Sequence, residues 1–80
     1  MFTATKTVYE VLAYKAATDG EPCNRDTSTR KADALRTARG WAKLYGRVEV
    51  NALYVSADDG TDIQAAALID AWENGTKTTT

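Results

Sequence analysis

The side chains in this sequence that are best suited to bind a partner are three cations. Arg36, Arg39 and Lys43 recur at intervals of three and four residues within a segment of helical periodicity. On a helix they lie within about 60° of one another, turned away from the apolar residues of the same segment. Guanidinium and ammonium groups in this arrangement can bind a phosphate backbone or an acidic protein surface. We call these three residues the basic face.

The simpler interpretation of the basic face is a solvated helix surface, because cations late in a helix also suit the helix dipole. Further cations lie near the two ends of the segment and would widen the candidate surface. They are Arg25, Arg30, Lys31 and Arg47.

A second candidate surface is acidic. Asp58 and Asp59 stand in a predicted turn, close to Asp62. A cluster of carboxylates can occupy a groove that normally holds nucleic acid, and Asp70 and Glu73 would extend it. The alternative is turn chemistry, combined with a helix N-terminus that favours an acid at position 62. No calcium loop of the D-x-[DN]-x-[DN]-G type occurs, so we expect no metal site.

Charge is segregated along the sequence. Residues 1–48 carry nine Lys/Arg and five Asp/Glu, a local net charge of +4. Residues 49–80 carry one Lys and six acids, a local net charge of −5, so that the whole chain has a net charge of only −1. Summed charges steer association and fix the orientation of a complex. The asymmetry therefore predicts oriented docking on a charged partner.

The residue types that most enzymes use are missing. The sequence contains no histidine and one cysteine, Cys23, and its five glycines form no phosphate-binding loop. Without histidine there is no side chain that titrates near neutral pH to act as general base. We therefore expect a protein that is not an enzyme and needs no cofactor. A lone cysteine and the lack of a secretory signal or a membrane-length apolar run indicate a cytoplasmic protein.

The aromatic residues allow two interpretations. Tyr9, Tyr14 and Tyr54 fall in predicted strands, where they can form a stacking platform for single-stranded nucleic acid. In a domain of this size, such tyrosines are more often core residues or rim residues with a hydrated hydroxyl. Trp41 and Trp72 fall on the apolar stripes of predicted helices, so we expect both in the core.

Apolar periodicity predicts the elements that position these groups. Thr7–Ala16 reads as a strand with apolar residues on both faces. The Asp19-Gly20 turn leads to a short edge strand at Glu21–Arg25. Arg47–Ser56 is a further strand, in which a change of apolar parity implies either a bulge near Asn51 or burial on both faces.

A long helix is predicted between these strands, from N-cap candidates at 26–29 to Tyr45. Its core-facing stripe consists of Ala34, Leu35, Ala38, Trp41, Ala42 and Tyr45. Gly46 follows as the residue expected just past the helix end. Gly40, inside the helix, costs about 1 kcal/mol relative to Ala, and it predicts the close approach of another backbone.

The segment after the Asp58–Gly60 turn allows two interpretations. A hairpin strand can start at Thr61, because Asp-Gly between apolar runs is typical of hairpins. We favour a helix over 62–73, since the apolar positions recur at helical spacing behind a capping box. A mobile tail is expected over 76–80. The prediction is one α+β domain over 1–80: an antiparallel sheet of about three strands under the long helix, with a short C-terminal helix, in the order ββαβα.

The order of these segments resembles that of small phage-encoded anti-CRISPR and other anti-defence proteins. The segments concerned are the strand YEVLAYKA, the Asp-Gly turn, the capped helix TSTRKADALRTARGWAKLYG and the strand RVEVNALYV. The resemblance is one of pattern over residues 7–56. It implies a stoichiometric inhibitor in the host cytosol, one that binds a bacterial nucleoprotein complex and blocks its nucleic-acid path.

We therefore expect a non-enzymatic inhibitor or adaptor that binds a host protein or nucleoprotein complex. It would use the basic face with the neighbouring Arg30 and Lys31, the Asp58-Asp59 turn, or both. The alternative is a small nucleic-acid-binding protein that uses the basic face directly, with an affinity that falls steeply with salt. A third reading is a homodimer whose sheet edge or apolar helix face pairs with itself.

Overall fold

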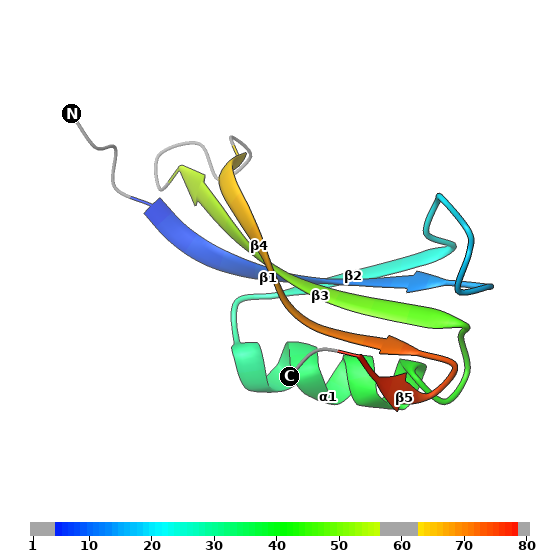
Figure 1. The fold of residues 1–80 in the computed structure, drawn as a ribbon. Coiled ribbons are helices and arrows are strands. Elements are labelled where there is room, and N and C mark those ends of the chain that lie inside the picture. The colour runs from blue at the N-terminus through cyan, green and yellow to red at the C-terminus, as the bar shows by residue number, and fades with distance from the viewer. Residues whose placement is uncertain (1–4, 57–62, 79–80) are drawn as a thin grey trace.

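The chain folds as an antiparallel sheet with a helix against one face (Figure 1). The computed structural model describes residues 5–56 and 63–78. Within them the elements are β1 (Thr5–Tyr14), β2 (Asn24–Ser28), α1 (Lys31–Trp41), β3 (Arg47–Ser56), β4 (Ile63–Glu73) and β5 (Thr76–Lys77). The strands lie in the order β2-β1-β3-β4-β5, and every neighbouring pair is antiparallel. The predicted α+β class is confirmed, although the described sheet has five strands where about three were expected.

The core lies between α1 and the centre of the sheet. Cross-strand pairing places Val11 of β1 beside Val50 of β3, which puts both side chains on one face. We call this the helix-side face of the sheet and the opposite one the open face. Small residues on α1 let the helix axis lie close to the strands. The fully or nearly fully buried members of the core are Val11, Ala13, Ala34, Ala38, Ala42, Val48, Val50 and Trp72. The apolar stripe predicted for the helix is thus confirmed.

The helix is shorter than its sequence signals predict. It begins at Lys31, because β2 continues through Ser28, which pairs with Tyr9 of β1. Of the expected N-cap residues 26–29, the first three belong to β2 and Thr29 lies in the turn after it. Arg30 occupies the N-cap position with no side-chain cap. Strand pairing here overrides local capping preference. The helix ends at Trp41 with Ala42 as C-cap, so Gly46 is not the residue that terminates it.

The helix predicted over 62–73 is wrong, since Ile63–Glu73 forms β4 and the hairpin alternative is the observed structure. The physical reason is a bulge. Val50 pairs with Asp70 and Asn51 with Leu68, which leaves Ile69 as an extra residue in β4. The extra residue shifts the face on which the following apolar side chains lie, so their spacing imitates helical periodicity. The segment for which a mobile tail was expected begins with β5.

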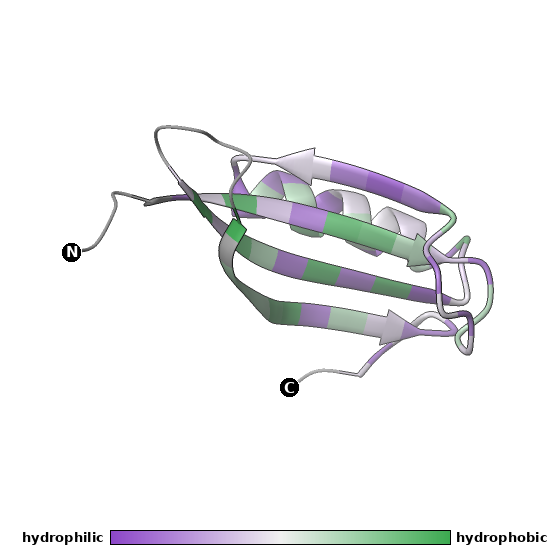
Figure 2. Ribbon diagram, turned by 90° about the horizontal axis from the view of Figure 1, so that it is seen from above, coloured by the Kyte–Doolittle hydropathy of each residue, from purple (hydrophilic) through white to green (hydrophobic). Residues whose placement is uncertain are grey.

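Half of the sheet projects beyond the helix (Figure 1). The ten or eleven residues of β1, β3 and β4 span roughly 33–36 Å at about 3.3 Å per residue, whereas the eleven residues of α1 span about 17 Å. The projecting half consists of Thr5–Val8, Leu53–Ser56 and Ile63–Leu68. Figure 2, which looks onto the open face, shows apolar residues in this half of the strands.

Arg47 fastens the loop after β1 to the open face of the sheet. Its guanidinium group donates hydrogen bonds to the carbonyl oxygens of Ala17, at 2.7 Å, and Asp19, at 3.1 Å. The same group stacks on the ring of Tyr14, with its central carbon 3.8 Å from the ring centroid. Tyr14 is buried beneath this group, and burial raises the pKa of its phenol above the usual 10.0.

This raised pKa predicts a loss of stability in alkali that depends on Tyr14. Below pH 10 the phenol is protonated in both the folded and unfolded chain, and its contribution is fully present. Above pH 10 the unfolded chain loses the proton first, so the free energy of unfolding falls as pH rises towards the folded pKa. We expect Tyr14→Phe to flatten this fall, as measured by urea unfolding between pH 6 and 11. The two proteins should have parallel profiles from pH 6 to 8, and parallel profiles up to pH 11 would contradict the prediction.

Candidate functional site

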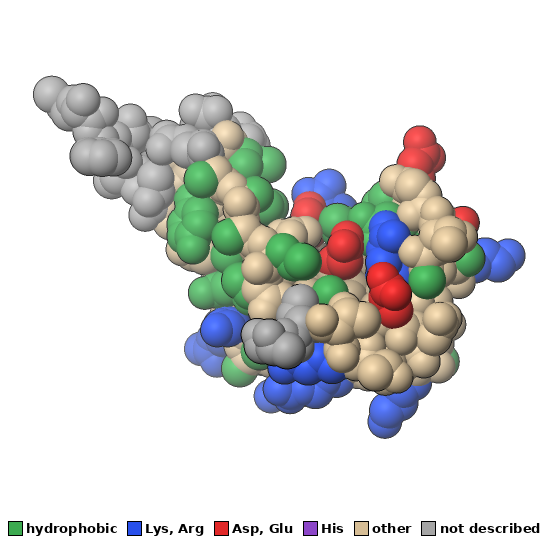
Figure 3. Space-filling view, viewed as in Figure 1, with side chains coloured by type: hydrophobic (Ala, Val, Ile, Leu, Met, Phe, Trp, Pro, Cys, Tyr) green, Lys and Arg blue, Asp and Glu red, His purple; other side chains and the backbone are tan. Residues whose placement is uncertain are grey.

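The basic face lies on the solvent side of α1. Ala34 and Ala38 are buried against the sheet, while Arg36 and Arg39 are exposed. Lys43 follows the helix, in a turn where the N–H of Lys43 bonds to the carbonyl oxygen of Gly40 at 3.4 Å. Lys43 is likewise exposed. Figure 3 shows Lys and Arg side chains gathered along the lower side of the molecule, where α1 lies in Figure 1.

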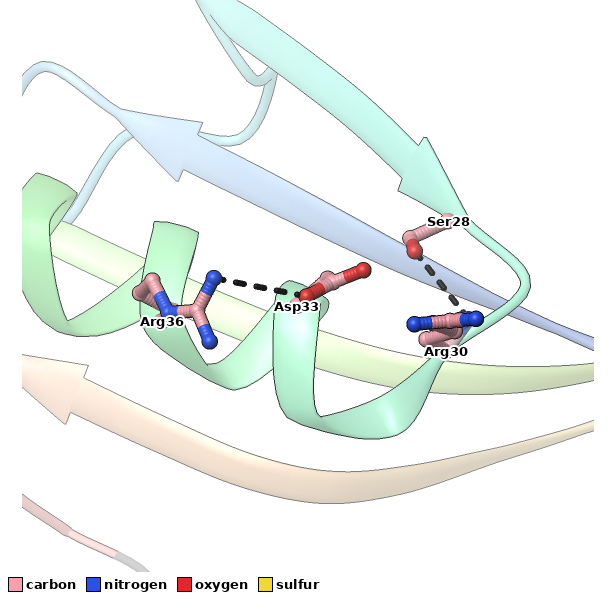
Figure 4. Close-up of polar contacts among 4 residues, drawn as sticks. All are labelled: Ser28, Arg30, Asp33 and Arg36. Carbon is pink, nitrogen blue, oxygen red and sulfur yellow. Dashed lines mark hydrogen bonds and ion pairs between the residues drawn. The ribbon is translucent and has the colours of Figure 1, made fainter.

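The charges of the basic face are largely uncompensated within the described ranges. Arg36 is 80% exposed and contacts Asp33 one turn earlier, with Nη1 3.5 Å from Oδ1 (Figure 4). An exposed pair of this kind contributes about 0–1 kcal/mol and leaves the cation accessible. Arg39 and Lys43 form no ion pair with any residue in 5–56 or 63–78.

Other cations of the chain are committed to internal contacts. Arg25 of β2 lies 2.7 Å from Glu10 of β1, and Lys77 lies 3.4 Å from the largely buried Asp70. Arg47 holds the loop after β1. The charges of these three residues are used in contacts within the fold, whereas those of the basic face are not. Arg25 and Arg47, which were grouped with the helix cations, therefore belong to the sheet.

Arg30 and Lys31 are exposed at the N-terminal end of α1. The N–H of Arg30 donates to the hydroxyl of Ser28 at 3.1 Å, which fixes the turn between β2 and the helix (Figure 4). Lys31 lies about 140° around the helix axis from Arg36, at about 100° per residue. These two cations therefore flank the basic face and do not continue its line.

The predicted acidic cluster is not assembled by the described residues. Asp58, Asp59 and Asp62 lie outside them. Asp70 is buried, with its side chain 10% exposed beside Lys77. Glu73 lies at the far end of β4, opposite Arg47 of β3. The two acids expected to extend the cluster thus lie in the C-terminal part of β4, where Asp70 is buried and Glu73 is exposed.

The tyrosines do not form one stacking platform. Tyr9 and Tyr54 lie on the helix-side face of the sheet, because they pair with Ala52 and Thr7. Tyr14 lies on the open face, buried beneath the guanidinium group of Arg47. The indole of Trp41 packs edge-on against Tyr45, with ring centroids 5.7 Å apart. Trp72 is in the core, as predicted, although on a strand.

One surface feature was missed by sequence reasoning. The projecting half of the sheet exposes large apolar side chains: Tyr54 is 39% exposed, Leu68 52% and Ile63 53%. Ala65, Ala66 and Ala67 between them are also exposed. In Figure 3 hydrophobic side chains gather over this half. A usable signal existed, because Ile63–Ile69 contains no charged residue in a chain that is 26% charged.

Neither a metal centre nor a membrane helix is present in the described ranges. No three His, Cys, Asp or Glu residues lie together there in a group that could hold a metal ion. The only helix there, α1, is too short and too polar to cross a bilayer. Comparisons of the whole chain with family models, with curated proteins and with solved structures find no match.

Proposed function

We propose that this protein is a non-enzymatic binding protein that docks through the basic face on an acidic surface of a host protein or nucleoprotein complex. Bound at that surface, it obstructs the adjacent path of nucleic acid. The observation that carries the proposal is the exposed and largely uncompensated charge of Arg36 and Arg39 on α1, and of Lys43 in the turn just after it, opposite a side that is packed into the core.

A helix held in this way presents its cations at fixed positions. Three alanines, Ala34, Ala38 and Ala42, are buried against the sheet, so the helix cannot roll without exposing the core. Fixed charges orient an approaching partner and raise its association rate. Little conformational entropy of the backbone is then lost on binding.

The charge balance favours a protein or nucleoprotein partner over free nucleic acid. The chain has a net charge of −1, and its C-terminal part is acidic. Affinity for free nucleic acid depends on the number of phosphate contacts that release counterions, and three cations supply few of them. Opposite charges in the two parts of the chain instead suit a partner that carries both signs.

The test is affinity capture from bacterial lysate with and without nuclease, using the tagged chain and the double variant Arg36→Glu/Arg39→Glu. We expect the wild type to retain a stoichiometric partner after nuclease treatment. The double variant should lose this partner. Each reversed charge should weaken binding by about 1.4 kcal/mol, so that the two together lower the affinity roughly 100-fold. Both substitutions are at exposed positions, so the fold should survive, as checked by far-UV circular dichroism.

The matched control is Lys6→Glu/Lys15→Glu, which changes the net charge equally at two exposed positions away from α1. This control should bind like the wild type. Equal loss in both double variants would mean that net charge alone matters, and it would contradict a role for the basic face. Partner recovery that vanishes with nuclease would show direct nucleic-acid binding instead.

A further inference from the structure

The N-terminal part of β4 is an open sheet edge within the described ranges. Residues from Ile63 to Leu68 lie beside β3 on one side. On the other side β5 pairs only with Trp72 and Glu73 at the far end of the strand. An edge of this kind presents a row of backbone N–H and C=O groups that can pair with another strand.

The two edges of the sheet differ in chemistry. The opposite edge is β2, a five-residue strand whose exposed Arg25 and Asp26 discourage pairing with another chain. The β4 edge has no charged residue and no proline from Ile63 to Ile69. Natural sheets protect long apolar edges with such residues, so an unprotected edge indicates a pairing site.

Both faces of the sheet beside this edge are apolar. On the open face Leu68 and Ile63 are about half exposed, next to the buried Leu53 and Val55 of β3. On the helix-side face Tyr54 is 39% exposed, beyond the end of α1. A strand added to β4 would therefore gain backbone hydrogen bonds and also cover apolar side chains on two sides.

A second copy of the chain offers a strand that matches this edge in chemistry. The occupant must be extended, apolar and uncharged, and β4 of a second copy has these properties. Antiparallel pairing about a two-fold axis brings Ile63–Ile69 against itself with no like charges in contact.

We propose that the protein forms a homodimer by antiparallel pairing of β4 with β4, which joins two sheets into one continuous sheet. The central residue of the uncharged run, Ala66, lies near the two-fold axis. Its small exposed side chain, between Ala65 and Ala67, lets two strands approach without steric conflict. The basic faces of the two copies stay exposed, because α1 does not take part.

The first test is sedimentation equilibrium of the full chain at concentrations from about 5 μM to about 1 mM, a range that detects dimers with dissociation constants down to the millimolar class. We expect a dimer for the wild type and a monomer for Ala66→Lys, since a charge on the edge blocks strand pairing. Thr27→Lys, on the exposed β2 edge, adds the same charge and should remain dimeric. Arg36→Glu/Arg39→Glu should also remain dimeric, which separates this result from the test of the basic face.

The second test does not depend on the folding of the lysine variant. In a Cys23→Ser background, Ala66→Cys should form an interchain disulfide on mild oxidation, because facing residues of paired strands have Cβ atoms about 4.5–5.5 Å apart. Thr27→Cys in the same background should not. A wild type that stays monomeric up to about 1 mM overturns the proposal. So does a dimer that Thr27→Lys disrupts and Ala66→Lys does not.

Discussion

Replacing Gly46 with alanine is expected to lower the free energy of unfolding by about 3 kcal/mol, the upper range for an over-packed site. A Cβ atom at this position would lie 2.7 Å from the Cα of Ala16 and from the backbone N of Ala17, and 2.8 Å from the carbonyl oxygen of Lys15. All three neighbours are backbone atoms, so no side chain can rotate to make room. The clash must be relieved by moving the loop after β1 or the start of β3.

Such a movement would also break hydrogen bonds. The N–H of Gly46 donates to Lys15 at 3.2 Å, and the carbonyl oxygen of Gly46 accepts from the N–H of Asn74 at 2.8 Å. Gly46 thus lies where the turn after the helix, the loop after β1 and the β4–β5 turn meet. Its φ is not in the left-handed region, so the requirement for glycine is one of space alone.

Gly40→Ala is the matched control, because it adds the same methyl group to the other glycine near the helix. A Cβ atom at Gly40 would have nothing within 4 Å, and the residue is exposed inside α1. We expect a gain in stability of about 1 kcal/mol from helix propensity. Urea unfolding at 25 °C, followed by circular dichroism, measures both variants. Changes of the same sign in the two proteins would contradict this assignment of their roles.

The two glycines also mark the limit of sequence reasoning on this fold. From the sequence, Gly40 was expected to admit another backbone and Gly46 to end the helix. Both expectations are wrong: no other backbone in the described ranges lies near Gly40, Gly46 is the residue that admits one, and the helix ends at Trp41. Both residues break helical propensity equally, so local signals do not distinguish them. What distinguishes them is the loop after β1, whose position depends on contacts distant in the sequence.

The buried stripe of α1 and the strand β3 were predicted correctly from local periodicity. The buried alanines of α1 follow from helical spacing, and β3 was found within its predicted limits, Arg47–Ser56. Burial on both faces of β3, one of two alternatives, is also observed, with Val50 on the helix side and Val55 on the open face. The bulge predicted as the other alternative lies in the partner strand, at Ile69. That bulge is why β4 was mistaken for a helix.

Of the two candidate surfaces, the basic face was predicted from local periodicity and the open edge of β4 was not. The exposure of Arg36 and Arg39 followed from their positions on the helix, because the buried stripe fixes the opposite side. Lys43 is exposed as expected, but it lies in the turn after the helix, which ends at Trp41. The uncharged run Ile63–Ile69 does not by itself place the open edge of β4, since an edge is defined by which strands are absent beside it. Strand order is a property of the whole sheet, and no window of sequence contains it.

Trp72→Ala is the second substitution for which we expect a large effect. Trp72 is 8% exposed, belongs to the core cluster and faces Val48, which is fully buried. Removing a buried indole costs about 3–5 kcal/mol through lost burial and the cavity that remains. A domain of 80 residues has a total stability of roughly 4–12 kcal/mol, so this variant should be near the limit of folding.

The contrast with Trp41 makes this prediction specific. Trp41 packs against the same core from the end of α1, but it is only partly buried and contacts the ring of Tyr45 at its edge. Its indole therefore covers the core from outside, and solvent can fill part of the space that Trp41→Ala creates. We expect Trp41→Ala to lower the free energy of unfolding by about half as much as Trp72→Ala, as measured by urea unfolding.

If Trp72→Ala does not fold, Trp72→Phe should still unfold at a lower urea concentration than the wild type, because the smaller ring leaves a cavity beside Val48. Equal costs for the two alanine variants would mean that β4 contributes no more to the core than the helix end does.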